Sequence, residues 1–226
     1  MASDLRRARD EQRKERRRGE LLSVAAALFV RKGYHATIIS DIAAEARVGQ
    51  GTVYRYFKDK RDILDHLFEE LVHKVFEQFS EMTSRPPSNE AEYRAASVEA
   101  LRKVVNVLDG ERDLVHLIIR EGPSIDREFG EKLAGLYERL AMLARYYLDN
   151  AIAGGFARQC DSKIVSQALI GIGVWMANLW CTGRLGDETP ERVLSEIVDL
   201  AFEGFGQSGN ANSLAGTHGH NNGGFD

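Results

Sequence analysis

Apolar residues recur every three to four positions along most of this chain, which is the spacing of an amphipathic α-helix. No stretch shows the strict apolar–polar alternation of a half-buried β-strand. The pattern therefore predicts an all-α fold of about nine helices. The expected helices lie at about 17–32, 38–46, 50–56, 60–79, 90–108, 111–121, 125–153, 161–185 and 189–205.

Residues that favour helix ends support these boundaries. Gly33 is expected to end the first helix in a left-handed conformation, and Gly154-Gly155 to end the long helix at 125–153. Gly122-Pro123 is expected to close the short helix at 111–121. Asp59 and Asp161 are expected to cap the N-termini of the helices that follow them.

Residues 37–60 contain two short helical patterns joined by a four-residue turn. Ile42 on the first helix and Val53 and Phe57 on the second are spaced to pack against each other, whereas polar side chains face outward. Thr37 is expected to cap the first of the two helices. This arrangement is typical of a helix-turn-helix, and on the pattern alone the alternative is an ordinary helical hairpin with a solvated polar face.

The same stretch carries a specific set of short motifs, namely Asp41-Ile42-Ala43, Ala46-Arg47-Val48-Gly49, Gly51-Thr52-Val53-Tyr54-Arg55-Tyr56-Phe57 and Lys60. In these motifs the chain resembles the DNA-binding domain of the TetR/AcrR family of bacterial transcriptional regulators, from about residue 21 to residue 64. Three positions depart from the family pattern. Arg47 replaces a turn glycine, Gly49 replaces a serine cap, and Tyr56 replaces a histidine. The turn and the phosphate contacts are therefore the parts of the motif that the resemblance supports least.

The resemblance implies a homodimer whose two recognition helices, each at about 50–56, enter successive major grooves of a near-palindromic operator. Candidates for contacts with base edges are Gln50, Thr52 and Arg55, because Gln pairs with adenine and Arg with guanine. Candidates for phosphate contacts are Thr37, the amides near Gly51, Tyr54, Tyr56, Lys58 and Lys60.

Charge divides the chain in a way that agrees with a DNA-binding N-terminus. Residues 1–61 hold 15 Lys/Arg and 8 Asp/Glu, a balance of +7, whereas the rest holds 15 and 26, a balance of −11. We expect a basic arm and DNA-binding domain at 1–62, an effector-binding and dimerisation domain at 63–206, and a disordered tail at 207–226. The strongly basic residues 5–18 are either a solvated lead-in or an arm that adds DNA contacts.

The last two expected helices carry more apolar residues than one buried face needs, which usually marks an interface. A larger intramolecular core is the alternative. Residues 164–183 carry no charge, but interspersed polar residues favour a helix buried on two sides over a membrane span. The expected dimer-interface residues are Ile172, Met176, Leu179, Trp180, Leu194, Ile197, Val198, Ala201, Phe202 and Phe205.

An effector is expected mainly because the resemblance implies one. An apolar or aromatic small molecule would suit an interior between the helices of the second domain. Candidate ligand-binding residues, each also explained by ordinary core packing, are His116, Leu117, Phe129, Leu133, Tyr137, Gln167, Trp175 and Asn178.

Motifs for other chemistry are missing. The sequence has no phosphate-binding loop, zinc-protease helix, nucleophile elbow or paired-cysteine motif, so we expect no enzyme activity, cofactor or metal site. Without a signal peptide or a convincing membrane span, the chain is expected to be cytoplasmic. Two alternatives stay open. The protein could be an effector-independent regulator or activator, or a helical enzyme or scaffold that keeps the hairpin only as structure.

Overall fold

The computed structural model describes residues 2–80 and 87–203. Within these residues the chain forms nine α-helices and no β-strand, which confirms the expected all-α fold. The helices are α1 (Ala2–Lys32), α2 (Ile39–Glu45), α3 (Gln50–Tyr56), α4 (Lys60–Glu77), α6 (Glu90–Gly110), α7 (Arg112–Ile125), α8 (Arg127–Ala153), α9 (Ser162–Cys181) and α10 (Pro190–Glu203).

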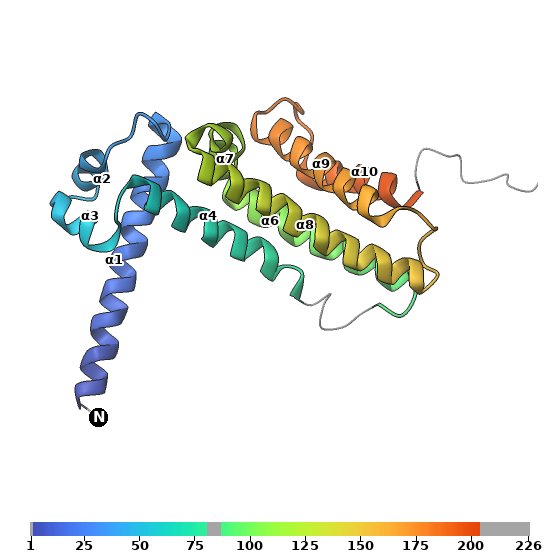
Figure 1. Ribbon diagram of the computed structural model, residues 1–226, viewed down its shortest axis with the longest axis horizontal. Coiled ribbons are helices and arrows are strands. Elements are labelled where there is room, and N and C mark those ends of the chain that lie inside the picture. The colour runs from blue at the N-terminus through green and yellow to red at the C-terminus, as the bar shows by residue number, and fades with distance from the viewer. Residues whose placement is uncertain (1, 81–86, 204–226) are drawn as a thin grey trace, which may run out of the picture.

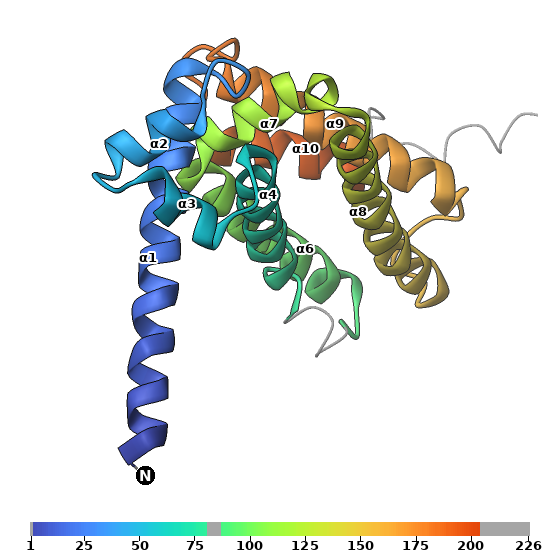
Figure 2. The ribbon, with the colours of Figure 1, turned by 60° about the vertical axis from the view of Figure 1, so that its left-hand side comes forward.

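The helices form two groups that are joined by α4. Helices α2 and α3 pack beside the C-terminal half of α1 at one end of the molecule, and α6 to α10 extend away from them (Figure 1). The N-terminal half of α1 projects from this body as a single helix in both views (Figure 2). Residues 6–17 of that projection are all exposed.

One continuous apolar core joins the two groups. It begins with Leu21 and Phe29 of α1, includes Ile42 and Val53 of α2 and α3, and continues through α4 into α7 and α8. Phe68 of α4 and Phe129 of α8 meet edge to face, with ring centroids 5.2 Å apart. Burying one such large side chain contributes roughly 1.5–3 kcal/mol. The helix-turn-helix is therefore packed on the second group rather than tethered to it.

Most predicted helix ends are found where the sequence placed them. Gly33 has φ 85°, and its N–H donates to Phe29 O at 2.9 Å. Asp59 and Asp161 accept hydrogen bonds from the N–H groups of Asp62 and Ile164, at 2.8 and 3.1 Å. These caps satisfy backbone donors that a helix start leaves unpaired.

The prediction that Gly122-Pro123 ends its helix is wrong, since α7 continues through both residues to Ile125. Proline costs one backbone hydrogen bond here, but the missing bond falls in the last turn, where carbonyls are already losing partners. The hydroxyl of Ser124 donates to one of them, Glu121 O, at 2.8 Å. Gly122 is needed for packing instead, because an added Cβ would lie 3.2 Å from the Phe129 ring.

Helix α9 ends at Cys181, four residues earlier than expected, because Gly183 adopts φ 68° after the C-cap Thr182. By length and composition it is the one helix in the described residues that is apolar enough to cross a membrane. The expectation that α9 is buried on two sides fails for the single chain, where only Ser162 and Ser166 are buried. Residues 81–86 lie outside the described residues, as do Phe205 and the tail at 207–226.

Candidate DNA-binding surface and ligand pocket

The turn between α2 and α3 is a Schellman motif built on Arg47. The N–H of Val48 donates to Ala43 O at 2.9 Å, and the N–H of Arg47 donates to Ala44 O at 3.1 Å. Arg47 has φ 54°, the one left-handed non-glycine residue in the described chain. The turn therefore keeps the geometry that a glycine would favour, with an arginine in its place.

Helix α3 divides its side chains between the core and solvent. Val53 and the following Phe57 are buried, which fixes the helix against α1 and α2. Gln50, Gly51, Tyr54 and Arg55 are exposed, and so is Lys58 just beyond the helix, whereas Thr52 and Tyr56 are partly buried. The predicted base-contacting residues Gln50, Thr52 and Arg55 thus share one short helix whose orientation the core sets.

Ion pairs hold α2 against α1. Lys32 Nζ lies 2.8 Å from Asp41 Oδ2, and Arg31 lies 3.3 Å from Glu45. The Asp41 carboxylate also accepts from the N–H of Ile38, the residue that precedes α2, at 3.3 Å. The hydrogen bonds from Lys32 and from the Ile38 backbone lower the pKa of Asp41. These contacts fix the orientation of α2 relative to α1.

Two predicted phosphate contacts are wrong for this conformation. Thr37 is 0% exposed, and its hydroxyl donates to Gly33 O at 2.8 Å, so its side chain cannot reach DNA. It does not cap α2 either, because Ile38 occupies the N-cap position. Thr37 instead ties the end of α1 to the loop before α2.

Lys60 also has an internal role. Its Nζ donates to Tyr34 O at 2.7 Å and to His35 O at 3.3 Å, and it lies 4.2 Å from the centre of the Tyr34 ring. Burial lowers the pKa of Lys60. An ammonium that satisfies two backbone carbonyls is a structural clamp on the loop, not a free phosphate contact.

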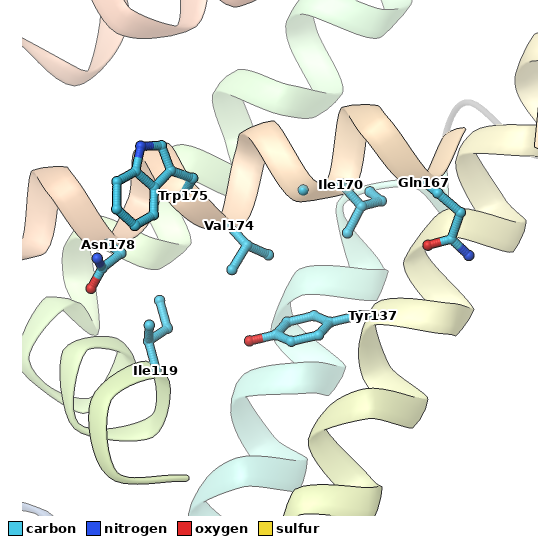
Figure 3. A pocket seen from close by; sticks show the side chains of 8 residues that line it. Ile119, Tyr137, Gln167, Ile170, Val174, Trp175 and Asn178 are labelled. Carbon is cyan, nitrogen blue, oxygen red and sulfur yellow. The ribbon is translucent and has the colours of Figure 1, made fainter. Parts of the chain in front are cut away.

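A cavity of about 480 Å³ opens between α7, α8 and α9. Figure 3 shows Ile170 and Val174 projecting from α9 toward the Tyr137 ring of α8, with Ile119 of α7 beside them. The Tyr137 hydroxyl points into this space, and burial raises the pKa of that phenol. The remaining lining residues are Gln167, Gly171, Trp175 and Asn178. An apolar wall with three polar side chains, two amides and a phenol, is typical of a small-molecule site.

Half of the predicted ligand residues line this cavity, and half do not. Tyr137, Gln167, Trp175 and Asn178 line it. Leu117, Phe129 and Leu133 are wrong as pocket residues, because they face α4 and the interior and belong to the continuous core. His116 lies nearly one turn before Ile119 on α7 and is not among the lining residues.

Four further lining residues were not predicted from the sequence, namely Ile119, Ile170, Gly171 and Val174. The three on α9 follow Gln167 at intervals of three, four and seven residues, so the helical spacing from that one polar residue could have identified them. Ile119 had no such signal, because only tertiary packing brings α7 against α9.

Two polar contacts link the helices around the cavity to the DNA-binding helices. Glu121 of α7 accepts a hydrogen bond from the N–H of Tyr34, with Oε2 and N 3.0 Å apart. Arg61 at the start of α4 donates from Nε to Asp126 Oδ2 at 2.7 Å and also pairs with Asp65. Its guanidinium lies 4.8 Å from the Phe129 ring centre. α7 and the start of α8 are thus bonded directly to the loop and helix that flank the hairpin.

Much of α10 is already packed within the chain, which corrects several predicted interface residues. Leu194 and Val198 are buried, and the Phe202 ring lies 5.7 Å from that of Tyr93 on α6. Trp180 is covered by Arg112, whose guanidinium is 5.0 Å from the indole. The exposed apolar surface is instead on α9, where Ile164 is 66% and Trp175 58% exposed.

Residues 21–67 match the family described as bacterial regulatory proteins, tetR family. This range holds the C-terminal half of α1, the whole hairpin and the start of α4, the elements whose geometry is described above. In this stretch the chain has the DNA-binding domain of the TetR family. Its family and relatives are transcriptional regulators and not enzymes.

Several proteins named as regulators match over most of the chain. The regulator HbdR of Aromatoleum sp. (strain CIB) is 28% identical over 74% of this chain and 71% of its own length. The fatty acid metabolism regulator protein of Bacillus subtilis is 26% identical over 70% and 83%. The repressor KstR2 of Rhodococcus jostii is 24% identical over 87% and 95%.

A solved structure of FadR from Bacillus subtilis, in complex with stearoyl-CoA, has the same fold. It matches with a TM-score of 0.69 at 21% identity, over 83% of this chain and 98% of that one. A putative TetR-family regulator from Syntrophomonas wolfei matches with a TM-score of 0.68 at 23% identity, over 83% and 93%. The all-helical arrangement therefore extends beyond the hairpin to the helices that form the cavity.

Proposed function

We propose that this protein is a ligand-responsive transcriptional repressor that binds a near-palindromic operator as a homodimer in the cytoplasm. The observation that carries the proposal is the division of α3, which buries Val53 and exposes Gln50, Tyr54 and Arg55 beside a basic N-terminus. Exposed glutamine and arginine on a helix fixed by its core are suited to read base edges in a major groove.

A second copy of the chain is the proposed partner of α9. Ile164, Ala168, Gly171 and Trp175 are exposed and recur at intervals of four, three and four residues, so they form one stripe. An apolar stripe of this length, left to solvent, favours association with a matching surface. A symmetric pairing of α9 helices would place two copies of α3 on the same side of the dimer.

The proposed effector is an apolar small molecule, and a long acyl chain is the first class to test. Ile119, Ile170 and Val174 supply the apolar wall, while Gln167 and Asn178 offer hydrogen bonds at the cavity. A volume of about 480 Å³ falls within the usual range of ligand sites, about 300–1,000 Å³. Two of the similar proteins point the same way, since one is named for fatty acid metabolism and one was solved with stearoyl-CoA.

Release from DNA would follow from movement of α7. A ligand against Ile119 acts on the helix whose Glu121 holds Tyr34, and Tyr34 lies in the loop before the hairpin. A ligand changes an equilibrium only by binding one state better than the other. The ligand therefore has to favour a position of α7 in which the two α3 helices no longer fit successive grooves.

The test measures binding of the chain to DNA upstream of its own gene, with and without acyl-CoA thioesters of increasing length. We expect specific binding, and weaker binding when a long-chain thioester is present. Val174→Trp fills the cavity and should abolish the ligand effect while leaving DNA affinity intact. Met142→Trp, a change to the same large residue at an exposed position on α8 outside the cavity lining, should preserve the ligand effect.

Each part of the proposal can fail separately. Specific DNA binding that no acyl or aromatic compound alters would favour an effector-independent regulator or activator. Absence of specific binding to any DNA would reject the regulator itself. A monomer at micromolar concentration, measured by sedimentation, would reject the homodimer.

A further inference from the structure

Most arginines of the projecting half of α1 lie on one side of the helix. Residues 6–18 contain eight basic and three acidic residues, a net charge of +5. At about 100° per residue, Arg6, Arg9, Arg13, Arg16 and Arg17 fall within one sector of roughly 100°. Asp10 lies at the edge of this sector, next to Arg17, whereas Glu11 and Glu15 lie on the opposite side of the helix. The projection therefore has a basic face and a mixed face.

Side-chain contacts connect the base of the projection to the DNA-binding domain. Arg18 Nη2 lies 2.8 Å from His66 Nδ1 on α4, and Arg18 Nη1 lies 3.7 Å from Glu15. Arg17 pairs with Glu20 at 2.8 Å. The packed half of α1 supplies the helix nucleus, so each further residue adds one hydrogen bond without the nucleation cost. The arginines N-terminal to these contacts therefore lie on a helix whose direction is set by the packed half of α1.

Internal contacts do not explain the basic face. Arg9 and Arg13 are exposed and have no ion pair among the described side chains. They lie four residues apart on the same side, a spacing at which like charges destabilise a helix. A polyanion bound along this face would remove that repulsion.

We propose that the basic face of residues 6–17 docks on the phosphate backbone of duplex DNA flanking the operator half-site. This inference rests on the proposed function, since α3 must first place the domain on DNA. A helix about 10 Å wide does not fit a minor groove about 6 Å wide, so the projection binds phosphates or the major groove edge rather than entering the minor groove.

The length of the projection sets the size of the added footprint. Residues 6–18 span about 20 Å at 1.5 Å per residue. At 3.4 Å per base pair this equals about six base pairs beyond the half-site. The contacts are to phosphates, so they add affinity without sequence preference.

The experiment compares two duplexes, with the operator first selected in vitro from random sequence by the full chain. One duplex ends at the footprint of a chain lacking residues 1–17, and the other extends it by ten base pairs of arbitrary sequence on each side. The wild-type chain should bind the longer duplex at least about fivefold tighter, with a salt dependence steeper by about 0.9 for each phosphate contacted.

Matched double variants test the face. Arg9→Gln/Arg13→Gln should lose the gain from the longer duplex, whereas Arg7→Gln/Lys14→Gln removes the same charge from the other side and should keep most of it. Arg9→Lys/Arg13→Lys keeps the charge and should restore the gain. Far-ultraviolet circular dichroism checks that the helix persists in each variant.

Three results would overturn the proposal. The wild-type chain could bind both duplexes equally, or the two Gln variants could lose the gain equally. The chain could also bind phosphatidylglycerol vesicles through Arg9 and Arg13 while gaining nothing from flanking DNA. Failure of the proposed function is a different result, in which neither duplex is bound specifically by any form of the chain.

Discussion

The carboxylate of Glu121 accepts a hydrogen bond from the backbone N–H of Tyr34, 87 positions away in the sequence, with Oε2 3.0 Å from the nitrogen. The carbonyl of the same Tyr34 accepts from Lys60 Nζ at 2.7 Å. One loop residue is therefore fixed between α7, which lines the cavity through Ile119, and α4, which carries on from the hairpin. A movement of α7 would act on this loop through Glu121.

We predict that Glu121→Ala uncouples the ligand from DNA binding. The change leaves the Tyr34 N–H without its acceptor, so a ligand that moves α7 no longer pulls on the loop. Glu121→Gln keeps an acceptor oxygen and should retain most of the coupling. The readout is DNA affinity with and without ligand, alongside thermal unfolding, where loss of the bond should cost on the order of 1 kcal/mol. An Ala variant with the full ligand effect would contradict this relay.

Arg61, Asp65, Lys132 and Asp126 form a charged cluster, the Arg61 cluster, that makes the stability of the fold sensitive to acid. Burial alone would lower the pKa of Arg61, but hydrogen bonds with Asp65 and Asp126 outweigh it and raise that pKa. Burial alone would raise the pKa of Asp65, but the hydrogen bonds from Arg61 and Lys132 outweigh burial and lower that pKa. The hydrogen bonds from Arg61 and from the Phe129 N–H lower the pKa of Asp126.

A carboxylate with a depressed pKa in the folded state stabilises the fold above its unfolded pKa of about 3.9 and loses that contribution as pH falls. We therefore predict that the unfolding free energy drops below about pH 4. Asp126→Asn keeps the cap on α8, since Asn also caps helices, but should flatten the drop. Asp187→Asn, an exposed carboxylate outside the cluster, should leave it unchanged. Urea unfolding from pH 2.5 to 7 supplies the measurement, and equal curves for Asp126→Asn and wild type would reject the role of the cluster.

Features set by neighbouring residues were predictable from the sequence, and features set by distant ones were not. Asp59 caps α4 as expected because the cap needs only the next three residues. Pro123 did not end α7, which continues to Ile125 and packs on α8 at Gly122. The burial of Val53 was predicted correctly from the helix pattern around it. The internal role of Lys60 was not predicted, because its hydrogen-bond partners lie 25 and 26 residues away.

The pocket and the interface show the same limit. An apolar residue on a helix reveals that it is buried but not which helix covers it. Leu133 was therefore predicted to line the pocket but lies in the core, and Leu194 was predicted at the dimer interface but packs within the chain. Tyr137 and Gln167, which line the cavity, gave no stronger signal than those two.

Arg47 offers a direct test of the turn. A left-handed conformation costs a non-glycine residue roughly 1–2 kcal/mol. Replacing Arg47 by glycine removes this cost, but the greater freedom of glycine in the unfolded chain offsets part of the gain in stability. We predict that Arg47→Gly raises the unfolding free energy by about 0.5–1 kcal/mol. Arg47→Ala, which keeps the strain, should not raise it. Chemical denaturation measures the unfolding free energy of both variants. Equal increases for Arg47→Gly and Arg47→Ala would mean that loss of the arginine side chain, not relief of backbone strain, causes the increase.

Arg55 and Lys58 are both exposed cations at the end of α3, but we predict different losses when they are removed. Arg55 lies on the helix, stacked 5.4 Å from the Tyr56 ring, where its fork can meet a guanine edge. Arg55→Ala should therefore reduce the preference for the operator over other DNA by about 1–3 kcal/mol. Lys58 lies beyond the helix, so Lys58→Ala should weaken all sequences alike and reduce the salt slope by about one per site. Titrations of operator and scrambled duplexes at several salt concentrations separate the two, and a uniform loss in Arg55→Ala would reassign that residue to the phosphates.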